Sequence, residues 1–253
     1  MPSVRLPGMT GTREWVYPQS IQGSFMRLRR VAFFGLHVVL FVAPWITMNG
    51  HPLAQIDLPH RRVFLFGAVF TPSDTIFLAL LLFFLAFALF FFTSIFGRVW
   101  CGYACPQTVF LETWIRPIEM WIEGDRSQRK RRDAQPWSFD RVWRKALKWT
   151  VFLTVSFLLA MAIMSLFAGA RALWTGTASA TSYALVGLLT LVWFADFMWF
   201  REQFCIYLCP YARFQSALTD AETLLVSYDE PRGEPREPKR GPEGGCIDCK
   251  KCV

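Results

Sequence analysis

Four long apolar runs constrain this chain more than any other feature. Residues 75–96 run for 22 positions without a charged side chain, and residues 150–170 run for 21. Two further runs, 31–48 and 183–200, contain one titratable residue each, His37 and Asp196. A helix of about 20 apolar residues spans a hydrocarbon core of about 30 Å, and a helix satisfies its own backbone groups there. We therefore predict an all-α integral membrane protein with four transmembrane helices, at about 31–48, 75–96, 150–170 and 180–200.

The basic residues predict the orientation of these helices. The net charge of +8 would suit nucleic acid only if the cations formed one face of a soluble fold. Instead, 24 of the 27 Lys and Arg residues lie in three alternate segments, 1–30, 97–149 and 201–253. The positive-inside rule places such segments in the cytoplasm. We predict a multi-pass protein of the cytoplasmic membrane with both ends inside, and a surface run, 129–132, that contacts membrane lipid or serves only as a topology signal.

A cysteine motif occurs twice, 104 residues apart. Trp100-Cys101-x-Tyr103-x-Cys105-Pro106-x₃-Phe110 aligns with Phe204-Cys205-x-Tyr207-x-Cys209-Pro210-x₃-Phe214. Each copy follows a predicted pair of transmembrane helices, and two helices return the chain to the same side of the membrane. We therefore predict two parallel two-helix repeats, with both cysteine pairs at the cytoplasmic surface and able to approach each other across a pseudo-two-fold axis.

All seven cysteines fall on the predicted cytoplasmic side, where stable disulfides are disfavoured, so their grouping favours metal or redox chemistry. Cys246, Cys249 and Cys252 have the first three spacings of the ferredoxin run C-x₂-C-x₂-C-x₃-C-P. This triplet predicts ligands of a 4Fe–4S cluster, with zinc as the competing metal. The fourth cysteine would be due at position 256, beyond the last residue, so we expect the chain to be an N-terminal fragment with an incomplete ligand set.

The two C-x₃-C-P pairs admit three interpretations. Residues i and i+4 share one helix face, so Cys101 with Cys105, and Cys205 with Cys209, are candidate ligands of one redox metal site. Four thiolates suit a cluster, zinc or Cu(I), since all are soft-ligand metals. Separate thiol or disulfide roles, and purely structural cysteines, are the alternatives. A proline after the second cysteine biases that cysteine away from helical geometry.

The order of these features divides the chain into four parts. Residues 1–30 are a cytoplasmic N-terminal arm, residues 31–228 the membrane domain, residues 229–245 a linker rich in Pro, Gly and charge, and residues 246–253 the start of a ferredoxin-type 4Fe–4S domain. Apolar residues from Val109 to Ile122 recur about every 3.6 positions with charged residues between them, which predicts an amphipathic helix on the inner surface, kinked at Pro117.

Several polar residues in or near the apolar runs have two readings each. His37 and Asp196 are either functional groups within the membrane or, respectively, a packed and a snorkelling side chain. Flanking residues that could balance thiolate charge or simply anchor the interface are Arg98, Tyr103, Arg201, Tyr207 and Arg213. Loosely spaced candidate copper ligands in the predicted outer loop are Met48, His51 and His60.

With these motifs the sequence closely resembles the cytochrome c oxidase accessory protein family (CcoG, FixG, RdxA). The resemblance rests on residues 100–109, 112–126, 201–215, 228–236 and 246–252, and it covers nearly the whole chain. It implies a polyferredoxin-like protein of the bacterial inner membrane with 4Fe–4S clusters facing the cytoplasm. It also implies a role in the assembly of a cbb-type haem–copper oxidase, with oxidase assembly factors as partners and copper ion as a substrate reduced from Cu(II) to Cu(I).

The function that we expect is therefore iron–sulfur electron transfer, an oxidoreductase activity that ends on a metal ion. One alternative is a quinol-oxidising subunit of a periplasmic reductase chain, a class that shares C-x₃-C-P repeats. Another is a copper-binding assembly factor that transfers the metal by thiolate exchange without net redox. The triplet Cys246, Cys249 and Cys252 favours electron transfer, because thiolate exchange would not need a cluster-type ligand run.

Overall fold

The computed structural model describes residues 23–134, 138–218 and 223. Most of the predicted N-terminal arm, the whole linker 229–245 and the cysteine triplet of 246–253 lie outside these described residues. Within them the chain is mostly helical, and three helices are long and apolar enough to cross a membrane: Pro72–Phe96, Phe139–Ala168 and Ala180–Phe200. These three overlap the second, third and fourth predicted spans, although the third helix begins at Phe139 and not near residue 150.

The first predicted span has different bounds in the structure. Helix α1 covers Ser24–Val42 and not 31–48, so it begins seven residues earlier and ends six residues earlier than predicted. It ends because Pro44 has no N–H to continue the ladder and enters a short 3₁₀ turn, Ala43–Trp45. The early start brings Arg27, Arg29 and Arg30 into the helix, and α1 is not among the three span-like helices.

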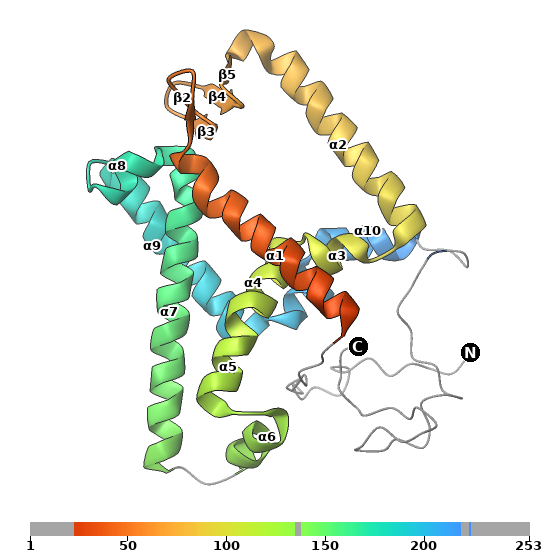
Figure 1. Ribbon diagram of the computed structural model, residues 1–253, viewed down its shortest axis with the longest axis vertical. Helices are drawn as coiled ribbons and strands as arrows, with labels where there is room; N and C mark the ends of the chain where they lie inside the picture. Colours follow the sequence, from red (N-terminus) through yellow and green to blue (C-terminus); the bar gives the residue numbers. More distant parts are fainter. Residues whose placement is uncertain (1–22, 135–137, 219–222, 224–253) are drawn as a thin grey trace.

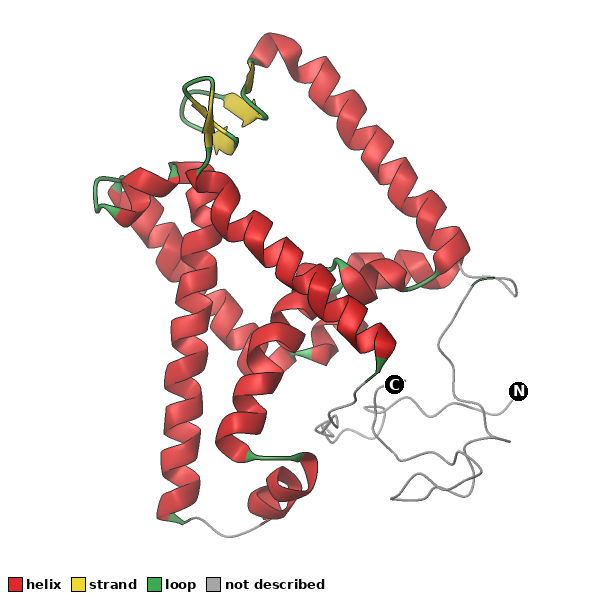
Figure 2. Cartoon of the chain, viewed as in Figure 1, coloured by secondary structure: helices red, strands yellow, loops and turns green. Residues whose placement is uncertain are grey.

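The loop between α1 and α2 folds into two small antiparallel sheets, so the prediction of an all-α chain was wrong (Figure 2). The strands are β1 (Thr47–Met48), β2 (His51–Pro52), β3 (Ala54–Asp57), β4 (Arg62–Leu65) and β5 (Ala68–Phe70). Two-residue turns with positive φ at both positions join β1 to β2 through Asn49-Gly50, and β4 to β5 through Phe66-Gly67. Asn-Gly is the commonest signal for this hairpin turn, and it is visible in the sequence.

The three span-like helices are packed very differently. Helix α2 (Thr75–Phe96) stands apart from α7 (Phe139–Ala168), and it meets the rest of the chain near its two ends (Figure 1). No residue of its most apolar window is buried within the chain, whereas 44% of the α7 window is buried. Helix α7 packs against α9 (Ala180–Ala195), which continues as a π-helical turn, Asp196–Phe200, and the short helix α8 (Ala170–Trp174) joins them.

Short helices carry the two cysteine motifs and the chain that follows them. They are α3 (Val99–Tyr103), α4 (Pro106–Phe110), a π-helical turn (Leu111–Ile115), α5 (Arg116–Glu123), α6 (Arg126–Ala134), a second π-helical turn (Phe204–Leu208) and α10 (Pro210–Leu218). The π-helical turn before α5 has a local cause, since Pro117 cannot donate to the carbonyl of Thr113 and the helix widens there.

The main apolar core joins the segment after the first cysteine pair to the rest of the bundle. Phe110, Ile115, Phe152 and Phe197 are buried together, with Phe33 of α1. Phe152 and Phe197 come from α7 and from the π-helical turn that extends α9. The core therefore fixes the elements on which the cysteine motifs lie.

Candidate metal centre

Each cysteine pair is shaped by the proline that follows it. Cys105 has extended backbone angles (φ −62°, ψ 124°) and precedes Pro106, the first residue of α4. Cys209 repeats this geometry (φ −74°, ψ 112°) before Pro210 and α10. The predicted departure from helical geometry is confirmed, because proline disfavours α geometry in the residue before it. The two cysteines of a pair therefore do not share one continuous helix, contrary to the reading of i and i+4 on a common face.

The structure brings the four described cysteines together. Cys101 lies near enough to Cys105 and Cys209 for ionised thiols to repel one another, and Cys205 lies as near to all three other cysteines. The Cys101 thiol also donates to the Gln215 side chain of α10 at 3.7 Å. All four thiols are unpaired in the structure and partly buried. Residues 104 positions apart in sequence thus form one neighbourhood of sulfur atoms.

Two of these thiols are poor acids in this setting. Burial, with the neighbouring cysteines, raises the pKa of Cys101 to about 11, although Arg98 opposes the shift. Burial and the other three cysteines raise the pKa of Cys205 to about 12. Both are therefore neutral thiols near pH 7, and a bound cation would have to displace their protons, as metal ions do when they coordinate sulfur.

The chemistry of this donor set fits a thiolate-held group. Four sulfur donors with few competing carboxylates match the ligands of iron–sulfur clusters, zinc and Cu(I). Within residues 23–134, 138–218 and 223, however, no three His, Cys, Asp or Glu side chains are grouped closely enough to hold a metal ion. The described cysteines therefore lie near one another and would have to draw together to ligate.

Two hydrogen bonds cross between the motifs in a reciprocal way. Gln107, two residues after Cys105, donates from Nε2 to Asp196 Oδ2 at 2.6 Å. Tyr211, two residues after Cys209, bonds through its hydroxyl to Thr93 Oγ1 at 2.6 Å. Because Thr93 donates its own proton to Leu89 O, Tyr211 is the donor in this pair. Gln107 thus joins the first motif to the end of the helix that precedes the second motif. Tyr211 joins the second motif to α2, the helix that precedes the first.

A buried ionic network lies beside the second motif, and sequence reasoning missed it. Glu119 of α5 is 3% exposed and pairs with Arg201, with Arg129 at 3.1 Å and with Lys148 at 3.7 Å. These cations hold the pKa of Glu119 below its usual value in spite of the burial. The amphipathic pattern placed Glu119 on a polar, exposed face. The only signal against that was the excess of arginine and lysine in the segments around α5.

The remaining candidate residues have ordinary partners. His37 accepts from Trp114 Nε1 at 2.8 Å, and its Nδ1 bonds to Phe33 O at 2.7 Å, so its ring packs as a structural histidine. His60 pairs with Asp57, and His51 stacks on Phe64. The outer-loop copper site therefore gains no support from the described residues.

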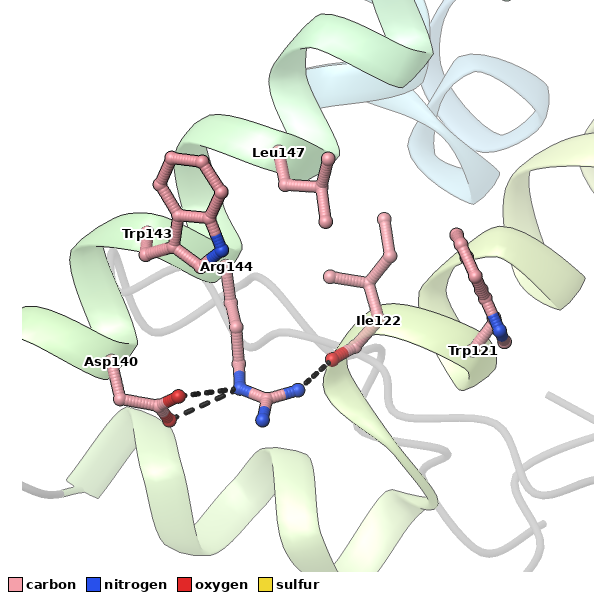
Figure 3. A pocket seen from close by; sticks show the side chains of 6 residues that line it. All are labelled: Trp121, Ile122, Asp140, Trp143, Arg144 and Leu147. Atoms are coloured by element: carbon pink, nitrogen blue, oxygen red, sulfur yellow. Dashed lines mark hydrogen bonds and ion pairs between the residues drawn. The ribbon is translucent and has the colours of Figure 1, made fainter.

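A shallow pocket lies between α5 and the start of α7 (Figure 3). Its polar end is closed by Arg144, which donates to Asp140 and to the Ile122 carbonyl at 2.7 Å. The full lining is Trp121, Ile122, Asp140, Trp143, Arg144 and Leu147. Because Arg144 already donates to Asp140 and to the Ile122 carbonyl, this pocket is a weaker candidate for a functional site than the four cysteines.

Comparison with protein families finds iron–sulfur models at both motifs. Residues 76–129, which contain Cys101 and Cys105, match a model described as a 4Fe–4S binding domain. Residues 200–253 match a model described as a 4Fe–4S dicluster domain, and this range contains Cys205, Cys209 and the C-terminal triplet. The chain therefore carries sequence of the iron–sulfur class in both halves.

Three similar proteins are longer than this chain. RdxB of Cereibacter sphaeroides is 37% identical over an alignment of 267 positions, which covers 100% of this chain and 56% of that protein. RdxA of the same organism is 40% identical over 94% of this chain and 53% of its own length, and the nitrogen fixation protein FixG of Rhizobium meliloti is 35% identical over 95% and 49%. The chain thus spans about half the length of these relatives. No solved structure shows a significant match.

Proposed function

Because the chain belongs to the family of RdxA, RdxB and FixG, we propose that it acts in the assembly of a cbb-type cytochrome oxidase by reducing Cu(II) to Cu(I). The broader class is a membrane iron–sulfur electron-transfer protein in oxidase-related processes, which the relatives and the two 4Fe–4S models support. Copper as the substrate and the assembly factors of the oxidase as partners are the specific parts of the proposal.

The observation that carries this proposal is the proximity of the two cysteine pairs. Cys101, Cys105, Cys205 and Cys209 come from motifs 104 residues apart in sequence, yet they lie near enough for ionised thiols to repel one another. If the cysteines were purely structural, nothing would require the two pairs to meet. Soft sulfur ligands bind Cu(I) better than Cu(II), so a site of four thiols stabilises the product of a one-electron reduction.

The proposed topology follows from the same elements. We place α1, α2, α7 and α9 across the membrane, with both cysteine pairs on the cytoplasmic side. Three of these helices meet the length and apolarity that a span requires, and the basic segments 97–149 and 201–253 follow the second and fourth. Each pair of helices then returns the chain to the side where the thiols lie, as parallel repeats require.

Each group of cysteines has a separate task in this scheme. Cys246, Cys249 and Cys252 would hold a 4Fe–4S cluster together with one further ligand, and such a cluster supplies single electrons. Cys101, Cys105, Cys205 and Cys209 would bind the metal ion that receives the electron. All four thiols are partly buried, and burial raises the pKa of Cys101 and Cys205, so these two stay protonated until a cation arrives.

Anaerobic purification followed by a Cu(I)-chelator assay tests the proposal. Protein that has been reduced with dithionite and then freed of excess reductant should be brown, give a 4Fe–4S signal in low-temperature EPR and transfer its electrons to added Cu(II). Cys105→Ser and Cys209→Ser should each abolish copper reduction while the EPR signal of the C-terminal cluster remains. Thr175→Ser, which keeps a hydroxyl in a remote loop, is the matched control and should behave as wild type.

Three outcomes would contradict the proposal, and two of them would indicate another function. A colourless protein that binds copper stoichiometrically, without reducing it, would indicate a non-redox assembly factor. Cysteine variants with unchanged copper reduction would show that the two pairs do not form the reducing centre. Reduction of the protein by a quinol, with no reduction of copper, would instead indicate a quinol-oxidising subunit.

A further inference from the structure

The helix that begins with α9 is broken at Arg201, before the second cysteine pair. Arg201 has a positive φ of 48°, which is unusual for a residue with a side chain. It separates two π-helical turns, Asp196–Phe200 and Phe204–Leu208, and such turns are frequent at functional sites. The position of Cys205 and Cys209 relative to α9 therefore depends on how this break is held.

Gln107 bonds to both ends of the π-helical turn Asp196–Phe200. Its Nε2 donates to Asp196 Oδ2 at 2.6 Å and to the Arg201 carbonyl at 3.3 Å. Gln107 and Asp196 are 7% and 8% exposed, so water does not compete for these bonds. Since Gln107 follows Cys105 by two residues, a single buried amide ties the first cysteine pair to the break that leads into the second.

The Asp196 carboxyl group depends on Gln107 for its hydrogen bonding. Asp196 Oδ1 is buried without a hydrogen-bond partner in the described part of the chain, and Oδ2 accepts from Gln107. Loss of the Gln107 amide would therefore leave a buried carboxyl group poorly satisfied, which is costly. The reciprocal bond from Tyr211 to Thr93 places a second such tie between the other Cys-Pro step and α2.

We propose that Gln107 and Asp196 are positioning residues that fix the separation of the two cysteine pairs. The inference deepens the proposed function, since it concerns the same four cysteines. It adds that the ligand spacing is set from outside the motifs, by one buried side-chain contact between the halves. Neither residue touches the metal or the thiols in this scheme.

An isosteric exchange tests the contact without changing its shape. Gln107→Glu places two carboxyl groups against each other, while Asp196→Asn keeps an oxygen that accepts from the Gln107 amide. The double variant Gln107→Glu with Asp196→Asn reverses donor and acceptor on the same heavy-atom framework. It also removes the donor to the Arg201 carbonyl, so we expect a return of most, not all, of the wild-type behaviour.

The readout is cross-linking of the full chain in membranes with diamide, which joins two nearby thiols as a disulfide and needs no metal. Tryptic peptides 99–126 and 202–213 carry the two pairs, so mass spectrometry reports links between them and separates these from the C-terminal cysteines. We expect the wild type and Asp196→Asn to link the peptides equally, Gln107→Glu to fall several-fold, and the double variant to recover. Co(II) titration gives a second measurement, because the intensity of the thiolate-to-cobalt charge-transfer band rises with the number of sulfur ligands. We expect that intensity to rank the variants in the same order as the cross-linking.

Either of two results would overturn the proposal: equal linking in Gln107→Glu and wild type, or a double variant as defective as Gln107→Glu. Helix content by circular dichroism and elution volume in detergent identify a variant that fails to fold, and the recovery in the double variant is decisive in that case. Failure of the proposed function is distinguishable. Loss of all copper reduction in a wild type with the expected cross-linking order would reject the redox role and keep the positioning role.

Discussion

The two halves of the molecule share a cysteine motif but differ in how it is buried. After the first pair the chain continues through α4 and α5 into the main core, where Phe110 is 5% exposed. After the second pair α10 lies beside the free-standing helix α2, and Phe214, the equivalent residue 104 positions later, is 60% exposed. For the long helices before the motifs the contrast is reversed, since α7 of the second half packs on α9 whereas α2 of the first half is unburied in the chain (Figure 1).

This difference shows what the repeated motif does and does not specify. Cys-Pro produces the same local turn in both copies, because proline acts on its immediate neighbour. The residues beyond that turn enter different surroundings, since α5 after the first copy packs on α7 whereas α10 after the second copy packs on α2. The first motif is therefore followed directly by the main core, which residues of both halves form, whereas α10 after the second motif lies outside that core.

The largest expected effect comes from Glu119, the centre of the ionic network that joins the halves. Glu119→Ala leaves Arg201, Arg129 and Lys148 without their shared buried carboxylate, and we expect a loss of about 3–5 kcal/mol in the free energy of unfolding. The equivalent position in the second half is Thr223, which donates to Ser94 O at 3.1 Å. Thr223→Ala should cost about 1 kcal/mol. Denaturant titrations of both variants in detergent compare them, and equal losses would contradict the asymmetry.

The paired phenylalanines test the same contrast in apolar packing. Phe110→Ala opens a cavity in the core and should cost about 3–5 kcal/mol. Phe214→Ala removes an exposed ring whose one ring contact is with Phe90 at a centroid distance of 6.4 Å, so about 1 kcal/mol is expected. Thermal unfolding followed by circular dichroism measures both. A cost for Phe214→Ala as large as that for Phe110→Ala would mean that α10 is buried in the membrane-embedded protein.

A smaller effect is expected at the reciprocal hydrogen bond. Tyr211→Phe removes the donor to Thr93, but the Thr93 hydroxyl keeps its bond to Leu89 O, so no proton donor is left unsatisfied. We expect a loss of about 0.5–1.5 kcal/mol and a modest fall in cross-linking between the two cysteine pairs. Thr93→Val should reproduce this loss. If Tyr211→Phe disrupted cross-linking more than Gln107→Glu, the contact of Tyr211 with Thr93 would matter more than that of Gln107 with Asp196.

The smallest expected effect is a difference in thiol reactivity between the halves. Only the thiolate reacts with iodoacetamide, so a raised pKa lowers the rate at neutral pH. With a pKa of about 11 for Cys101 and about 12 for Cys205, alkylation of these two residues in the metal-free protein should rise roughly tenfold per unit from pH 8 to 10 without levelling. Cys101 should react faster than Cys205. A plateau near pH 9, the value for an unperturbed thiol, would show that the site is open to water.

The sequence by itself determined the parts of this protein that depend on neighbouring residues. The apolar runs 75–96, 150–170 and 180–200 are helices because a long uncharged segment satisfies its backbone in no other way within a membrane. The Cys-Pro turns followed from proline sterics, and the Asn49-Gly50 hairpin was equally legible, although we did not predict it. The kinship with RdxA, RdxB and FixG likewise needed only the motifs and their spacing.

Only the tertiary structure decided which residues meet. Glu119 lies in a segment with the pattern of a surface helix, and its burial depends on cations brought from α6, α7 and the break at Arg201. Gln107 and Asp196 are 89 positions apart, and no local preference of either residue requires their contact. Such pairs form because a buried polar group needs a hydrogen-bond partner, and the packing of the helices decides which residue lies close enough. The spacing of the two residues in the sequence does not predict this contact.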